Sequence, residues 1–193
     1  MPTMHNTERS TPADHASPRW PAWLRPTLIG MLAVGLNILA YYLIPPDFAR
    51  RLGRFGFLGV FIVTFVANAT VIVPVPYIGL IVRMAQTLDV GGVVLAGALG
   101  SAMGESVAFF VGRAGRETVN DTWLYRWVQR QMERPWRAFV ALFLLAAPPN
   151  PAFDVAGLTA GAMGLPFWLF FGAVFLGRMI RIALFALGGA WFA

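Results

Sequence analysis

Long apolar runs without charged residues dominate the chain. Residues 26–44 form an uncharged run of 19 residues, residues 55–82 form one of 28, and residues 138–177 contain a single charge, that of Asp154. A helix of about 20 apolar residues spans the hydrocarbon core of a bilayer. The pattern therefore predicts an all-α, multi-pass integral membrane protein, with its last helix over residues 167–190.

Residues 1–24 lack this pattern, because they are polar and rich in proline. Such a composition cannot bury enough apolar surface to offset the entropy of ordering the chain, so we predict a disordered N-terminal tail. Trp20 and Trp23 lie next to arginines, an arrangement typical of the membrane–water interface. We therefore expect residues 25–193 to form a single membrane domain.

Closely spaced prolines interrupt two of the apolar runs. A proline lacks an N–H donor and disfavours a helical residue before it, so each run must break there. At membrane depth, broken backbone is tolerated only where protein or a water-filled cavity surrounds it. The breaks align at an offset of 75 residues. The few identities in that alignment do not establish a repeat, but paired proline-broken segments are typical of inverted-repeat transporters. We predict two opposed re-entrant hairpins, with turns at Pro74, Pro76, Pro148, Pro149, Asn150 and Pro151.

Two apolar segments, residues 90–112 and 155–164, are crowded with glycine and alanine. In lipid, small residues let helix backbones approach closely, because packing rather than the hydrophobic effect drives helix association there. Both segments are therefore expected to pack tightly against neighbouring helices.

Few ionisable residues lie within or beside the apolar runs, and each is a candidate functional group. Asp154 could titrate with a coupling ion or act as a helix N-cap. Glu105 could bind a proton or substrate, or form a buried ion pair with Arg113, Arg178 or Arg181. Arg178 and Arg181 are three residues apart and share nearly one helix face. They could hold a phosphate headgroup, for which the forked guanidinium is suited, or neutralise Glu105 and Asp154.

Composition agrees with the membrane class, since 58% of the residues are hydrophobic and only 12% are charged. There is no cysteine, and both histidines lie in the tail, so we expect neither a metal centre nor a cofactor. An enzyme is not expected either, because the chain contains no H-E-x-x-H or G-x-S-x-G motif.

The net charge of +6 comes from arginines that flank the apolar runs. Their position favours cytoplasmic loops and anionic lipid headgroups as the cause of the basic excess, rather than nucleic acid. Residues 113–137 contain six arginines, which predicts that this loop faces the cytoplasm.

Three stretches within about residues 55–189 carry a resemblance to a known family. The first runs from Asn68 to Tyr77 and is similar to a proline-rich re-entrant turn. The second, residues 97–115, resembles a glycine-rich signature with an acid and a Gly-Arg pair, and the third, residues 148–178, has a P-x-x-D…G-x-x-A-G pattern followed by Gly-Arg. Together they resemble the DedA family, also called the VTT-domain or SNARE-associated Golgi protein family.

The resemblance implies opposed re-entrant hairpins and transport of a phospholipid or lipid-linked phosphate across the cell inner membrane, coupled in some members to a proton or sodium gradient. It assigns the family's acid to Glu105, its Gly-Arg arginine to Arg113 and a branch-specific acid to Asp154. Carboxylates that many members carry around the first turn are replaced here, by Ala67 on one side and by Tyr77 on the other. Mechanisms that use those acids therefore do not transfer.

Two other functions stay open at this point. The protein could export a small ion or solute, with lipid only as its solvent. It could also be a membrane-biogenesis scaffold that transports nothing, with purely structural buried charges. The sequence does not fix the oligomeric state, and a homo-oligomer is one alternative.

Overall fold

A computed structural model of the chain describes residues 24–45, 51, 53, 55–70, 76–115, 126, 130, 134–148 and 152–191. These residues form seven helices and no strand, which confirms the all-α prediction. The helices are α1 (Leu24–Leu43), α3 (Phe55–Ala69), α4 (Tyr77–Ala85), α5 (Val90–Ala114), α7 (Pro135–Ala146), α8 (Ala152–Ala162) and α9 (Phe167–Trp191). Nearly all of the predicted tail lies outside the described residues, as do Pro74, Pro149, Asn150 and Pro151.

Two of the described helices, α5 and α9, are long and apolar enough to cross a membrane. Each has 25 residues, which corresponds to about 37 Å at a rise of 1.5 Å per residue. Residues 113–137 were expected to be a loop, and this is wrong at both ends. The apolar face of α5 continues through Gly112, so the helix reaches Ala114, and Pro135 provides a favourable first residue for α7.

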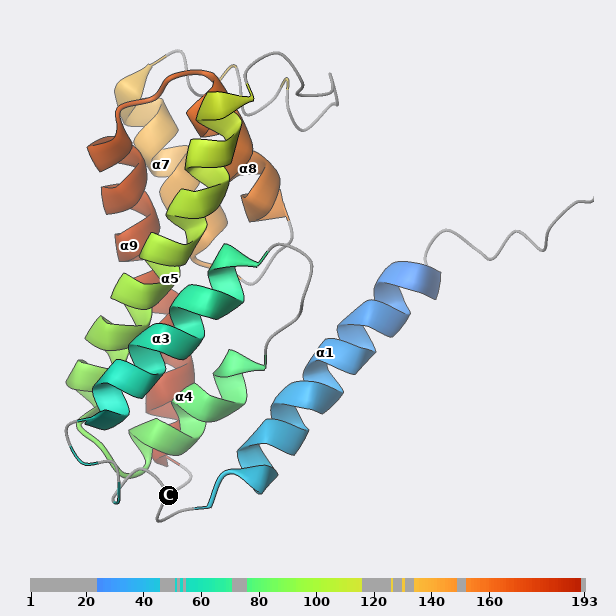
Figure 1. Cartoon of the computed structure of the whole chain (residues 1–193), viewed down its shortest axis with the longest axis vertical. Coiled ribbons are helices and arrows are strands. Elements are labelled where there is room, and N and C mark those ends of the chain that lie inside the picture. Colours follow the sequence, from blue (N-terminus) through green and yellow to red (C-terminus); the bar gives the residue numbers. More distant parts are fainter. Residues whose placement is uncertain are drawn as a thin grey trace, which may run out of the picture.

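After α1, the described helices form two triplets of similar design, each with two short helices followed by a long one. The first triplet is α3, α4 and α5, and the second is α7, α8 and α9. Figure 1 shows α3 entering from the lower end of the molecule and α7 from the upper end. Within each triplet the first short helix packs on the long one, whereas α4 packs on α9 and α8 packs on α5, across the triplets.

The two long helices lie side by side and run antiparallel. Gly97 of α5 faces Ile182 in the second half of α9, and Phe109 of α5 stacks on Phe170 near its start, with ring centroids 4.7 Å apart. Together α5 and α9 form the centre around which the four short helices are arranged (Figure 1).

Small residues on α5 and α8 allow close helix contacts, as the glycine-rich segments predicted. A Cβ atom at Gly104 would lie 2.9 Å from the backbone nitrogen of Ala69 in α3. On the other side of α5, a Cβ atom at Gly112 would lie 2.7 Å from the carbonyl carbon of Leu158, and one at Gly161 of α8 would overlap Phe109 O. A side chain at any of these positions would push two backbones apart.

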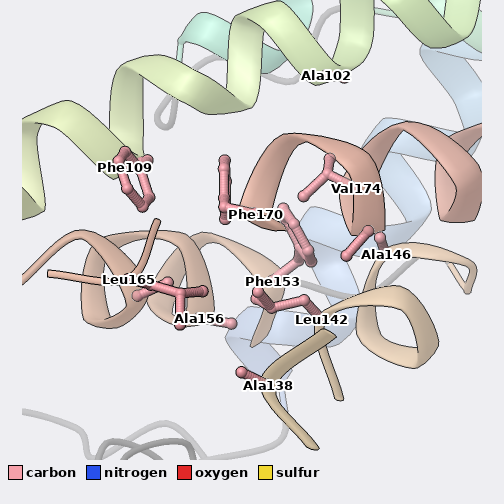
Figure 2. Close-up of a cluster of buried hydrophobic side chains, with 12 residues drawn as sticks. Ala102, Phe109, Ala138, Leu142, Ala146, Phe153, Ala156, Leu165, Phe170 and Val174 are labelled. Atoms are coloured by element: carbon pink, nitrogen blue, oxygen red, sulfur yellow. The ribbon is translucent and has the colours of Figure 1, made fainter. Parts of the chain in front are cut away.

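The buried apolar residues form two separate clusters. The α7–α8 cluster lies in one half of the molecule, where Phe109, Phe153 and Phe170 point toward one another (Figure 2). The α3–α4 cluster lies in the other half and includes Val60, Ile81, Met84, Val93, Ala98, Ile182 and Ala186. Each cluster receives residues from both long helices, so α5 and α9 connect the two halves.

Candidate functional site

A group of buried polar residues separates the two apolar clusters. On α9, Val174 belongs to the α7–α8 cluster and Ile182 to the α3–α4 cluster, and Arg178 lies midway between them. On α5, buried Ser101 lies between Ala98 of the α3–α4 cluster and Ala102 of the α7–α8 cluster, and buried Glu105 follows one turn later. Glu105 and Arg178 are therefore placed deep in the molecule, where the two triplets meet.

Glu105 and Arg178 form an ion pair. Nη2 of Arg178 donates a hydrogen bond to Oε1 of Glu105. The side chain of Glu105 is only 3% exposed and that of Arg178 only 4%. A charge-assisted hydrogen bond is stronger than a neutral one, and removing either partner would leave the other charge buried. Of the three arginines considered as partners for Glu105, the structure brings Arg178 to it.

The two arginines of α9 reach the first turns of two different short helices. Cζ of Arg178 lies 4.9 Å from the ring centroid of Phe153, in the first turn of α8. Cζ of Arg181 lies 5.9 Å from the ring centroid of Tyr77, the first residue of α4. Both distances fall within the range of cation–π attraction. Two cations on α9 thus lie beside the N-terminal ends of α4 and α8.

Two buried polar atoms at this level have hydrogen-bonding capacity that the described residues do not use. Ser101 Oγ is fully buried and has no hydrogen-bond partner there, and the same holds for Nε of Arg178. In native proteins such atoms usually bond to water, an ion or a ligand. The centre of the molecule can therefore accept additional polar atoms.

The remaining predicted site residues are not part of the buried ion pair. Asp154 is the third residue of α8 and directly follows Phe153, but its side chain lies outside the described part. Arg113 is exposed in the last turn of α5, where a cation interacts favourably with the helix dipole. It is two turns beyond Glu105 and does not join the buried pair. Pro76 directly precedes α4, and Pro148 follows the end of α7.

Asn37, which contacts the first turn of α4, is a polar residue that the sequence reasoning missed. It belongs to α1, and its Oδ1 accepts hydrogen bonds from the backbone nitrogens of Ile78 and Gly79 at 3.0 and 3.1 Å. The available signal was an amide side chain in the middle of the uncharged run 26–44.

Within the described ranges, no group of three or more His, Cys, Asp or Glu side chains could hold a metal ion.

The family model for the VTT domain matches residues 75–191. The vacuole membrane protein 1 homolog of Dictyostelium discoideum is 48% identical over 42 residues, which is 22% of this chain and 10% of that protein. The vacuole membrane protein KMS1 of Arabidopsis thaliana and vacuole membrane protein 1 of Homo sapiens match with the same identity and coverage. The match thus spans about a tenth of the length of these relatives. No solved structure matches the chain.

Proposed function

The chain belongs to the VTT-domain family, and on that premise we propose that this membrane protein transports a phospholipid or a lipid-linked phosphate across the bilayer. The observation that carries the proposal is the Glu105–Arg178 ion pair, buried where the two helix triplets meet. Ionisable residues within a membrane are rare, and they commonly mark the path of a substrate or ion.

In this proposal the triplets are an inverted repeat, and α3–α4 and α7–α8 are re-entrant hairpins. The first helix of each pair has 15 and 12 residues, respectively. These correspond to about 22 and 18 Å, less than the ~30 Å of a hydrocarbon core. The exchange of α4 and α8 between the long helices fits two related units that are packed head to tail. The substrate would then bind between the hairpins, as inverted-repeat transporters do.

Arg178 is the group proposed to hold the phosphate. Its planar guanidinium can donate two parallel hydrogen bonds to phosphate oxygens. In the structure it donates to Glu105 instead. A proton or a sodium ion at Glu105 would neutralise the carboxylate and release Arg178 for the substrate. Substrate binding and ion uptake would be linked through this exchange of partners.

Arg181 is proposed as a second headgroup contact, because it lies one turn after Arg178 and is half-buried beside Tyr77. Asp154 is proposed to share ion coupling with Glu105, since it occupies the first turn of α8 next to Phe153, which touches Arg178. Arg113 is assigned to the membrane surface, where it would attract anionic headgroups.

The proposed location and topology of the protein rest on the distribution of its charged residues along the sequence. We propose an inner-membrane location with residues 113–137 on the cytoplasmic side, following the arginine excess of that segment. We further propose that the protein is not an enzyme, needs no cofactor and binds no nucleic acid. A homo-oligomer is compatible with this assignment.

One observation favours a second candidate, a scaffold without transport activity. Glu105 and Arg178 are almost fully buried and satisfy each other's charge, as a purely structural pair would. The two candidates predict different flipping activities for variants that alter the Glu105–Arg178 pair but still fold.

Reconstitution into liposomes tests the proposal. Purified protein is incorporated into vesicles that contain a fluorescent phospholipid, and exposure of the lipid to an impermeant quencher reports flipping. We expect wild-type flipping, a loss of about tenfold or more in Glu105→Gln and Arg178→Lys, and unchanged flipping in the matched control Leu184→Ala, a 68% exposed position on α9. Folded variants with wild-type flipping would favour the scaffold, and solute flux without lipid movement would favour an exporter.

A further inference from the structure

Helix α4 begins without a cap of its own. Its N-cap residue is Pro76, which makes no side-chain hydrogen bond to the first turn. The first backbone N–H groups of any helix lack partners within the helix, and in a dry environment they need an acceptor from elsewhere. For α4 this acceptor comes from another helix, since Oδ1 of Asn37 in α1 accepts from both Ile78 N and Gly79 N.

The orientation of the Asn37 side chain is fixed from both sides. Its Nδ2 donates to Ala33 O at 2.8 Å, one turn earlier in α1, and this leaves Oδ1 directed at α4. The backbones of the two helices also touch here. A Cβ atom at Gly79 would overlap the carbonyl oxygen of Asn37, so only glycine fits. Helices α1 and α4 are therefore held together here by directed hydrogen bonds and by close backbone packing.

Polar contacts hold the other end of α4 as well. Nε of Arg83 donates to Ile44 O, just past the end of α1, at 2.9 Å. Nε2 of Gln86 donates to the hydroxyl of Tyr41 at 3.2 Å and to Gly189 O of α9 at 3.3 Å. Among the described helices, α1 packs on α4 alone. Helix α1 thus contacts α4 at both of its ends, and among the described helices α4 connects α1 to the rest of the protein.

We propose that Asn37 is a positioning residue of the transport site. By holding the first turn of α4, it sets the ring of Tyr77 against the guanidinium of Arg181, 5.9 Å away. Because Arg181 is a headgroup contact only if the protein moves lipids, this inference rests on the proposed function. It also extends the working unit beyond the matched family domain, which begins at residue 75, whereas α1 ends at Leu43.

Two substitutions at Asn37 separate positioning from bulk stability. Asn37→Leu keeps the approximate volume but removes the acceptor, whereas Asn37→Asp keeps an acceptor for both amides. Leu39→Ala, at a 52% exposed position of α1, is the matched control. Amide hydrogen exchange in micelles is measured on full-length protein at Ile78 and Gly79. Flipping is measured in liposomes with a phosphatidylglycerol probe and a phosphatidylcholine probe.

The expected result is that exchange at Ile78 and Gly79 becomes about fivefold faster in Asn37→Leu, as for loss of a helix cap, and stays slow in Asn37→Asp and the control. We also expect the wild type to flip the anionic probe faster than the zwitterionic one, Asn37→Leu to lose this preference, and Asn37→Asp to keep it. A general loss of stability would lower both flipping rates equally.

Three outcomes would overturn the inference while leaving the proposed function in place. Unchanged exchange in Asn37→Leu would mean that the cap does not hold α4. Faster exchange with an unchanged headgroup preference would reduce Asn37 to a structural cap. Equal loss of flipping for both probes would likewise assign it to stability. If the wild-type protein flips neither probe, the proposed function itself fails, and the positioning role fails with it, while the exchange data still report separately whether the cap forms.

Discussion

The buried pair of Glu105 and Arg178 makes a quantitative prediction about stability. Glu105→Leu would leave a guanidinium, which cannot shed its proton, without its carboxylate in the centre of the protein. Breaking one partner of a buried ion pair costs about 3–5 kcal/mol. An uncompensated charge at mid-membrane costs about 2.5–3.5 kcal/mol on insertion scales. With side chains only 3% and 4% exposed, solvent can screen little of this, so we expect about 3 kcal/mol.

The reverse change and the double variant complete a thermodynamic cycle. Arg178→Met should cost less than Glu105→Leu, because a carboxylate left behind can take up a proton. In the double variant two apolar side chains replace the pair, and such replacements are often neutral or stabilising. We therefore expect the double variant to unfold within about 1 kcal/mol of the wild type, with a coupling energy of about 3 kcal/mol or more between the two sites.

The free energy of unfolding would be measured in mixed micelles by titration with SDS, followed by circular dichroism. Leu184→Met, at the exposed face of α9, controls for the effect of a methionine and should change stability by less than about 0.5 kcal/mol. Additive single effects, with a coupling energy below about 1 kcal/mol, would refute the reasoning. The two charges would then not depend on each other.

Four further predictions concern other positions on the helices. Gly161→Ala should destabilise by about 1–3 kcal/mol in SDS titration, because its Cβ would overlap Phe109 O. By contrast, Gly188→Ala meets nothing within 4 Å and should be neutral or stabilising by up to about 1 kcal/mol. Ser101→Ala should leave the unfolding free energy unchanged within about 0.5 kcal/mol but slow flipping, if Ser101 Oγ serves a polar path rather than the fold. Asp154→Asn should abolish the response of flipping to an imposed pH gradient, and an unchanged response would remove Asp154 from ion coupling.

Much of the helical architecture could be predicted from local sequence. Charge-free runs and proline positions predicted a last helix over residues 167–190, and α9 runs from Phe167 to Trp191. The same signals predicted a break at Pro74 and Pro76, and α4, which has 9 residues, begins directly after Pro76. The motifs around Gly97, Gly112 and Pro148 predicted the family. The resemblance to the VTT-domain family is confirmed by the family match to residues 75–191.

The choice of partners could not be predicted, because it depends on how the helices are aligned with one another. Three arginines were candidates for Glu105, and nothing near Glu105 in the sequence distinguishes them. The pairing with Arg178 follows from the antiparallel register of α5 and α9, which the contacts of Gly97 and Phe109 with α9 fix. Asn37 was missed for the same reason, since its acceptor role depends on amides 41 and 42 residues later in the chain.

The exchange of short helices between the triplets also has a consequence for how the protein is made. Helix α4 packs on α9, so the first half cannot complete its structure until the second half has been synthesised. Arg178 follows Glu105 by 73 residues. At about 5–20 residues per second, a ribosome needs roughly 4–15 s to add them. During that interval Glu105 is in the nascent chain without Arg178. Release of α5 from the insertion machinery before α9 arrives would therefore be disfavoured, and the two halves are expected to enter the bilayer as one unit.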